Sequence, residues 1–243
     1  MAGASSPIVV DMDEAGGVSL GKTNVPEFGF PAYGENLLPQ GSARNPWDLT
    51  RDPGGSSSGA AAAVAARMLP FAPGNDAGGS IRIPAAFCGV FGLKPSFGRV
   101  PAHPYSTMSV LAHLGPLTRS VADSAFMLSL IGRPDDRDIY ATNTPCPDFT
   151  QGLDAGVLRR RIAFVRTLPF ACPVDPEIAA GVEAAAKVFT ELGAEVREVE
   201  LPMEDPRAIA DTLWQTGAAL AMRAMTSAAE AGVDPGLIEE VRM

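Results

Sequence analysis

The sequence predicts an α/β fold, because helical and strand patterns alternate along its 243 residues. The clearest observation is a β-α-β pattern. A short apolar strand at 161–165 is followed by an amphipathic helix that Asp175-Pro176-Glu177 begins, and then by an alternating strand at 194–199. A second observation is an alanine-rich helix at 56–67, capped by serine and followed by an apolar strand pattern at 68–72.

Composition and charge restrict the class of protein. Hydrophobic residues make up 46% and charged residues 19%, which is typical of a globular chain rather than a disordered one. At this length, one large domain or two small ones can form a substantial core. The net charge of -9 argues against a nucleic-acid or anionic-membrane partner, because both require a basic face. We find no leader pattern and no apolar run of membrane-spanning length.

The few cysteines and histidines indicate that no metal or other cofactor is bound. Cys88, Cys146 and Cys172 are odd in number and widely spaced, which favours reduced thiols in a cytoplasmic protein. His103 and His113 are the two histidines, and there is no Cys-x-x-Cys pair, so a zinc site is not expected. We therefore expect an acidic, globular, cytoplasmic protein.

The remaining elements follow in chain order. Residues 7–14 resemble the end of a helix that leads into a short buried strand at 18–20, and residues 23–55 are loop-like, with prolines throughout. Residues 73–101 form an irregular stretch rich in glycine and proline. A helix is predicted at 120–132, where Ser120 and Asp123 approximate a capping box and Gly132 ends the helix, and another at 208–231. In the helix of the β-α-β pattern, one face is lined by Ile178, Val182, Ala185, Val188, Phe189 and Leu192.

Two glycine-serine clusters are the candidates for chemistry, at 54–59 and at 78–80. A helix outward and a strand back can return the chain to its starting point, so Ser56 and Ser80 could face each other. A serine hydroxyl is a poor nucleophile unless a neighbour accepts its proton, and a second hydroxyl can relay that proton to a stronger base. Adjacent glycines let backbone N–H groups approach an oxyanion. Asp76 and Arg82 could hold the loop through charge-assisted hydrogen bonds.

Other interpretations of these clusters remain open. Glycine-serine clusters are most often turns and helix caps. Residues 55–59 match the G-x-S-x-G nucleophile elbow, but that elbow requires a buried strand directly before it, whereas residues 45–53 contain prolines and charges. No phosphate-loop pattern is present. Lys22 is a candidate general base, although a lysine at the end of a strand is more often structural.

A resemblance to a known family narrows these alternatives. The segment "GGSSSGAAAAVAARMLPFAPGNDAGGSIRIPAAFCGVFGLKPSFGRVP", residues 54–101, closely resembles the signature block of the amidase signature family. Flanking segments resemble the family's recurring pieces in the same order: "GKTNVPEFG", "NPWD", "GPLTRSVADSA" and "GRPDDRD". The resemblance extends over about residues 8–202 and is specific, because so many ordered motifs do not match by chance.

The resemblance implies an α/β/α fold around a mixed β-sheet flanked by helices, and a Ser–cis-Ser–Lys triad that hydrolyses amides through an acyl-enzyme. By motif match, Ser80 would be the nucleophile and Ser56 the cis-serine. The oxyanion hole would consist of the backbone amides of Ala77, Gly78, Gly79 and Ser80, supported by Ser57, Asp76 and Arg82. Ser58 departs from the family, which more often has glycine there, and we expect it to tighten the turn.

The lysine of the triad is the main departure from the family. The chain's three lysines are Lys22, Lys94 and Lys187, and none falls in the family's upstream "KD"-type motif. We therefore expect residues 1–243 to be one partial amidase domain, shortened at both ends, with no second domain. The chain would be a fragment of a longer enzyme, a piece of a split amidase, or a short variant without catalysis. The isolated chain is then expected to have little activity, since loss of a general base costs about 10²–10⁴-fold.

Three functions stay open on this basis. The first is a stand-alone amidase acting on a small-molecule amide, as a homodimer or with a completing second chain. The second is the glutamine-hydrolysing subunit of a tRNA-dependent amidotransferase. Those subunits commonly have glutamine at the position of Ile83 and a "SLDQIGPLTR"-like stretch in place of "SVLAHLGPLTR", so both features favour the stand-alone amidase. The third is a non-catalytic binding module.

Overall fold

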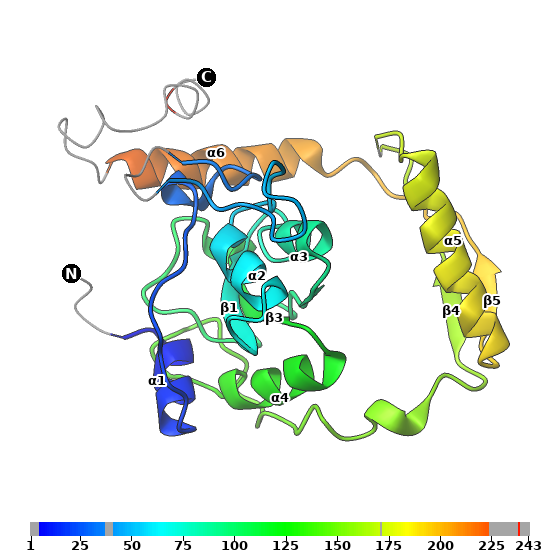
Figure 1. Cartoon of the computed structure of the whole chain (residues 1–243), viewed down its shortest axis with the longest axis horizontal. Coiled ribbons are helices and arrows are strands. Elements are labelled where there is room, and N and C mark those ends of the chain that lie inside the picture. The colour runs from blue at the N-terminus through cyan, green and yellow to red at the C-terminus, as the bar shows by residue number, and fades with distance from the viewer. Residues whose placement is uncertain (1–4, 37–40, 171, 224–237, 239–243) are drawn as a thin grey trace. The chain divides into compact units, whose positions relative to one another are not determined.

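The computed structural model describes residues 5–36, 41–170, 172–223 and 238. The chain forms two compact units, which are described separately (Figure 1). The first contains residues 1–151 and 213–243, and the second contains residues 152–212. Helix α6 (Arg207–Arg223) begins in the second unit and ends in the first.

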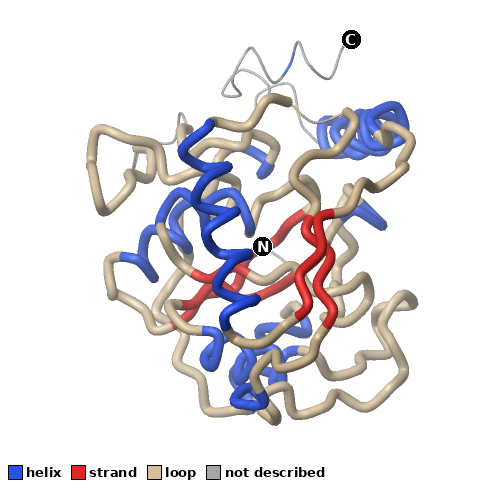
Figure 2. Tube along the Cα trace, turned by 90° about the vertical axis from the view of Figure 1, so that its right-hand side faces the viewer, coloured by secondary structure: helices blue, strands red, loops and turns tan. Residues whose placement is uncertain are grey.

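The first unit is built around a three-stranded antiparallel sheet with the strand order β1-β3-β2. Long loops connect most of its elements (Figure 2). These elements are α1 (Pro7–Glu14), η1 (Glu27–Gly29), α2 (Ser58–Ala65), β1 (Phe71–Asp76), α3 (Arg82–Cys88), β2 (Phe91–Gly92), η2 (Ser109–Leu111), β3 (His113–Thr118) and α4 (Val121–Ile131).

The core of this unit brings the ends of α2 and β1 to one place. Helix α2 presents Ala61 and Val64 to a fully buried cluster that includes Ile81 and Leu117. Strand β1 runs antiparallel to β3, with Phe71 opposite Thr118 and Asp76 opposite His113. The first turn of α2 and the last residue of β1 are therefore positioned by the same apolar core, which is what places the two glycine-serine segments.

The second unit confirms the predicted β-α-β pattern. Strands β4 (Arg161–Phe164) and β5 (Glu195–Glu198) pair in parallel and are joined by helix α5 (Pro176–Glu191). The Asp175 side chain accepts a hydrogen bond of 2.8 Å from the Glu177 amide, which is the N-cap that the sequence predicts. A short 3₁₀ turn, η3 (Leu153–Ala155), precedes β4.

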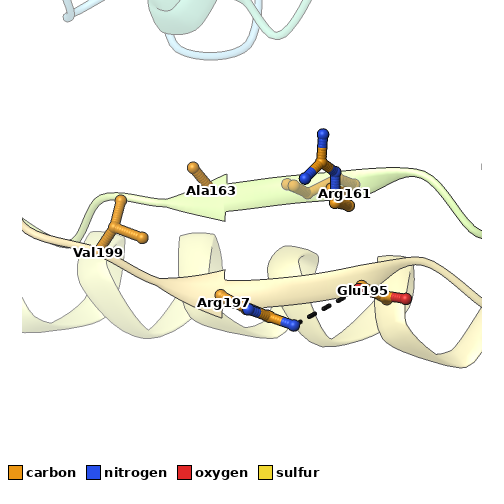
Figure 3. A pocket seen from close by; sticks show the side chains of 6 residues that line it. Arg161, Ala163, Glu195, Arg197 and Val199 are labelled. Carbon is orange, nitrogen blue, oxygen red and sulfur yellow. Dashed lines mark ion pairs between the residues drawn. The ribbon is translucent and has the colours of Figure 1, made fainter.

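A shallow hollow lies on the sheet of the second unit (Figure 3). It is lined by Arg161, Ile162, Ala163, Glu195, Arg197 and Val199. Within it, Arg197 and Glu195 form an ion pair of 3.7 Å, marked by the dashed line in Figure 3. The hollow contains none of the residues that the sequence predicts for catalysis.

The apolar face of α5 is not covered by the described residues. Its side chains are 40% to 60% exposed, namely Ile178, Val182, Val188, Phe189 and Leu192. The amphipathic period predicts the helix correctly, because that period depends only on local geometry.

Gly181 provides a direct test of the stability of α5. A Cβ at this glycine would have no atom within 4 Å, and its φ is not positive. Alanine restricts the unfolded chain and favours helix, so we expect Gly181→Ala to raise the free energy of unfolding by about 0.5–1 kcal/mol. Urea denaturation followed by circular dichroism measures this change, and an unchanged or lower unfolding midpoint would contradict it.

Two parts of the predicted secondary structure were wrong. Residues 18–20 are not a buried strand: Val18 is 81% and Leu20 is 75% exposed, and no described strand pairs with them. The stretch 73–101 is more regular than predicted, since it holds most of β1 together with α3 and β2. Pro84 concealed α3, although proline is tolerated in the first helical turn.

The remaining helices agree with the prediction in type. The Ser120 side chain accepts a hydrogen bond of 3.1 Å from the Asp123 amide, so it caps α4 as expected. Helix α2 begins at Ser58, two residues inside its predicted start. Helix α6 accounts for most of the predicted helix 208–231, and residues 224–231 lie outside the described residues. Strand β3, with Gly115 and Pro116 in its sequence, was not predicted.

No helix among the described residues is long and apolar enough to cross a membrane.

Candidate active site

The structure brings the two glycine-serine segments together. The Ser57 amide donates a hydrogen bond of 3.0 Å to the Ser80 carbonyl oxygen, so the backbones of the two segments lie side by side. Ser56 and Ser80 are each 8% exposed. The Gly55–Ser56 peptide bond is cis, the conformation that the family resemblance implies for this serine. Within the described residues, neither serine hydroxyl has a hydrogen-bond partner, so both are available to other groups.

A loop before α2 packs closely around Ser56. The Gly55 amide donates a hydrogen bond of 2.7 Å to the Ala32 carbonyl oxygen. A Cβ at Gly55 would overlap the Tyr33 carbonyl oxygen, and a Cβ at Gly29 would lie 3.3 Å from Ser56 Oγ. Glycine is therefore required at Gly55 by close backbone approach, and residues 29–33 form one side of the site.

Asp76 is the anchor of the loop that carries Ser80. Its carboxylate is fully buried and accepts hydrogen bonds from the amides of Gly79 and Ile81 at 2.8 and 3.2 Å. Arg82 donates from Nε and Nη2, each at 2.9 Å, in a bidentate arrangement, and its own amide donates at 3.4 Å. A single carboxylate thus ties together the end of β1, the Ser80 loop and the start of α3.

This network keeps Asp76 ionised. Burial of the side chain raises the pKa of the carboxyl, but the hydrogen bonds from Arg82, Gly79 and Ile81 and the charge of Arg82 outweigh it, so the pKa lies below its usual value. The hydrogen bond with Asp76 raises the pKa of the Arg82 guanidinium. At neutral pH the Asp76 carboxylate is therefore negatively charged and the Arg82 guanidinium positively charged.

The backbone amides around Ser80 fall into two groups. The Gly79 amide is already directed at Asp76 Oδ1. The amides of Ala77, Gly78 and Ser80 make no hydrogen bond to any other described residue. Unpaired N–H groups beside a serine hydroxyl are able to bind a negatively charged oxygen. The available donors are thus three of the four predicted amides, while Gly79 holds the loop.

The two serines that follow Ser56 both make structural contacts. Ser57 Oγ donates to the Asn75 carbonyl oxygen at 3.4 Å and accepts from the Asn75 amide at 3.3 Å, which ties the segment to β1. Ser58 is fully buried, and its Oγ donates to the Asn24 carbonyl oxygen at 3.2 Å. Ser58 therefore fastens a distant loop, in addition to any effect on its own turn.

The hydrogen-bond partners of the lysines in the described part of the chain lie elsewhere than in the serine pair. Lys94 Nζ donates to the Pro95 carbonyl oxygen at 2.9 Å, and Lys187 pairs with Glu183 at 3.3 Å in the second unit. Lys22 lies in an exposed loop segment. Among the described residues, no lysine makes a hydrogen bond to Ser56 or Ser80.

Sequence reasoning missed several residues that shape the site. Asp52 accepts hydrogen bonds from the Gly34 amide at 2.9 Å and from the Gly54 amide at 2.6 Å, and so joins the loop to the serine segment. Trp214 of α6 lies against Gly78. The Asp-x-Gly spacing at 52–54 is a recognisable turn signal for Asp52. Nothing in the local sequence indicates the position of Trp214.

The described residues contain no group of three or more His, Cys, Asp or Glu side chains that could hold a metal ion.

Comparisons with known proteins place this geometry in a family. The sequence model of the family described as Amidase matches residues 1–239. A glutamyl-tRNA(Gln) amidotransferase subunit from Chromohalobacter salexigens is 45% identical over 196 residues, which are 80% of this chain and 40% of that protein. The crystal structure of a bacterial aryl acylamidase of the amidase signature family superposes with a TM-score of 0.89 at 34% identity.

The matches cover 80% to 99% of this chain but only part of each relative. The aryl acylamidase match includes 99% of this chain and 51% of that chain. The crystal structure of a glutamyl-tRNA(Gln) amidotransferase subunit from Thermotoga maritima matches with a TM-score of 0.77 at 31% identity, over 94% of this chain and 50% of that one. This chain thus spans 40% of the curated relative's length and about half of each of these two solved relatives. On the match over residues 1–239, the chain belongs to the amidase signature family.

Proposed function

We propose that this chain carries the nucleophile of an amidase that hydrolyses a carboxamide C–N bond through an acyl-enzyme at Ser80. The observation that carries the proposal is the hydrogen bond from the Ser57 amide to the Ser80 carbonyl oxygen, which sets the two serine segments side by side. The amides of Ala77, Gly78 and Ser80 support it, because they belong to the loop that carries the attacking hydroxyl and have no hydrogen-bond partner among the described residues.

The proposed reaction has two halves. Ser80 Oγ attacks the amide carbonyl carbon while its proton passes to Ser56 Oγ, and the Ser56 proton passes to a general base. The oxyanion is held by the free amides of the Ser80 loop. Collapse of this intermediate breaks the C–N bond, and the amine leaves with a proton returned by the base. Water then attacks the ester at Ser80, which releases the carboxylic acid and restores the hydroxyl.

The general base is proposed to lie outside these 243 residues. The chain spans 40% of the length of a curated relative, and its own lysines make no hydrogen bond to either serine within the described part of the chain. We propose that the base is supplied by further polypeptide, in the same protein or in a second chain. The match of one family model over residues 1–239 supports treating the chain as part of one amidase domain.

Glutamine hydrolysis within a larger amidotransferase complex is the second candidate. It is favoured by relatives that are 43% to 45% identical and are named as subunits of glutamyl-tRNA(Gln) amidotransferase. Ile83 argues against it. A Cβ at Gly79 would lie 2.6 Å from Ile83 Cδ1, so an apolar side chain packs on the loop where those subunits commonly have glutamine. We therefore propose the amidase that acts on small amides first.

A labelling experiment tests the nucleophile. After exposure of the purified chain to a fluorophosphonate, intact mass spectrometry is expected to show one adduct, which peptide mapping places at Ser80. Ser80→Ala should remove the adduct. Ser96→Ala is the matched control, because Ser96 is an exposed serine of the same block and should not affect labelling. Absence of an adduct at Ser80 even when a primary amine is added as a substitute base would instead favour a non-catalytic module.

A second measurement tests the missing base. Hydrolysis of a simple aryl amide by the isolated chain is expected to be about 10²–10⁴-fold slower than by a complete enzyme. Added primary amine should raise the rate in the parent chain but not in Ser80→Ala. Substantial Ser80-dependent hydrolysis without added amine would show that a base within the chain suffices, and would overturn this part of the proposal.

A further inference from the structure

Trp214 of α6 lies against the loop that carries Ser80. A Cβ built on Gly78 would be 3.2 Å from Trp214 Cζ3 and 3.7 Å from Cη2, so the indole ring sits where a side chain at Gly78 would be. Trp214 is only partly buried, and the ring therefore has surface left to contact another group. Both residues belong to the first compact unit.

Phe30 packs against the indole and follows a residue that approaches the other serine. The ring centroids of Phe30 and Trp214 are 5.5 Å apart at an interplanar angle of 81°, an edge-to-face contact. Phe30 is 7% exposed. The preceding residue, Gly29, approaches Ser56, since a Cβ there would be 3.3 Å from Ser56 Oγ. The aromatic pair therefore reaches from the Ser80 loop to the Ser56 segment.

Ile83 adds an apolar side chain at the junction of the same two segments. A Cβ at Gly54 would be 3.1 Å from Ile83 Cγ2, and one at Gly79 would be 2.6 Å from Ile83 Cδ1. Gly54 precedes Ser56 and Gly79 precedes Ser80. The described side chains next to the two glycine-serine loops thus include an isoleucine and an aromatic pair, drawn from three separate elements.

We infer that Trp214 is a specificity-determining residue that favours amides with a planar aromatic acyl group. This inference rests on the proposed function, because it assumes that the carbonyl oxygen binds at the free amides of Gly78 and Ser80. A carbonyl bound there has its substituent close to Gly78, within reach of the indole. Aromatic rings gain from stacked or edge-to-face contact beyond the burial of their area, and a saturated ring does not.

A comparison of two amides measures this preference without turnover. Benzamide and cyclohexanecarboxamide differ mainly in that one ring is planar and aromatic. Ligand-observed NMR on the purified chain should give benzamide an affinity about three- to tenfold higher than that of cyclohexanecarboxamide.

Fluorescence of Trp214 gives a second measurement. Because the chain has two tryptophans, Trp47→Phe leaves Trp214 as the single tryptophan fluorophore, and benzamide should change its emission. Trp47 is 76% exposed, and its Nε1 donates to the Cys88 carbonyl oxygen at 2.8 Å, at the end of α3 away from the Ser80 loop, so this substitution should leave the site intact.

Variants locate the preference on the indole. Trp214→Leu should remove the preference for benzamide, and Trp214→Phe should retain most of it. Circular dichroism checks that each variant folds, and the comparison of the two amides on the parent chain needs no variant. Equal affinities on the parent chain, or a preference that persists in Trp214→Leu, would overturn the inference.

The outcome is distinguishable from failure of the proposed function. Ser80→Ala should keep the ratio of affinities for benzamide and cyclohexanecarboxamide, because the ring and not the hydroxyl determines the preference. If the fluorophosphonate labels Ser80 but the two amides bind equally, the nucleophile stands and the specificity inference fails. If Ser80 is not labelled but benzamide is preferred through Trp214, the aromatic site stands and the proposed hydrolysis fails.

Discussion

Asp76→Asn is expected to lower the free energy of unfolding by about 3 kcal/mol, because the carboxylate is fully buried and accepts hydrogen bonds from three backbone amides and from the Arg82 guanidinium. An amide side chain has one acceptor oxygen and presents N–H groups to donors that would be left unpaired. Arg82 is half exposed, with 54% of its side chain accessible, so water limits the cost on its side. Urea denaturation measures the change.

Matched variants separate the anchor from a general effect of charge. Arg82→Gln should cost less, about 1–2 kcal/mol, because the amides of Gly79 and Ile81 still hold the carboxylate. Asp48→Asn is the surface comparison: that side chain is 46% accessible and accepts hydrogen bonds from Thr50 and Arg51, so its replacement should cost some stability but less than at Asp76. An Asp76→Asn protein as stable as the Asp48→Asn protein would contradict the assignment of Asp76 as an anchor.

The pH dependence of stability follows from the same carboxyl group. Its pKa in the folded chain is below the usual value, so its stabilising contribution is present above the unfolded-state pKa and is lost as pH falls. The parent chain should therefore lose unfolding free energy below about pH 4. Asp76→Asn should lose less over the same interval, and the difference between the two curves isolates this group from the other carboxylates.

Gly55→Ala is expected to lower the free energy of unfolding by about 2–3 kcal/mol and to reduce labelling of Ser80. A Cβ there would overlap the Tyr33 carbonyl oxygen and lie 2.8 Å from both the Pro31 oxygen and the Tyr33 nitrogen. All three are backbone atoms, which cannot rotate away as a side chain does. Relief requires movement of the loop that packs against the serine segment.

Gly181→Ala is the matched control for this substitution, because the same chemical change at an open site in α5 should stabilise the chain. Urea denaturation and fluorophosphonate labelling should be measured on both proteins. If Gly55→Ala unfolds at the same urea concentration as the parent and is labelled at the same rate, the close backbone approach does not support the site.

The α/β class and several helices and strands could be predicted, because local sequence patterns were sufficient to identify them. The alanine-rich helix, the capped helix at Ser120 and the β-α-β unit whose helix Asp175 caps all depend on propensity, capping and periodicity within a few residues. Helix α3 and strand β3 were missed because Pro84 and Pro116 are signals that normally end such elements. Their pairing and packing outweigh those local signals.

The residues of the candidate site and the meeting of its two segments could be predicted, but the hydrogen bonding of its backbone amides could not. The glycine-serine clusters, and the Asp76–Arg82 pair that the structure contains, were readable from residue types and spacing. That the Gly79 amide binds Asp76, while its neighbours Ala77 and Gly78 keep theirs free, depends on how the loop turns.

The sequence by itself determined the family, the class of fold and the candidate serine pair. Each of these can be recognised from short motifs, local patterns and their order along the chain. Only the tertiary structure showed which side chains from distant parts of the chain pack next to that pair. Phe30 and Trp214 are far apart in the chain and lie 5.5 Å apart between ring centroids. Their contact results from the packing of α6 onto the loop, and such long-range packing leaves no periodic signal in either local sequence.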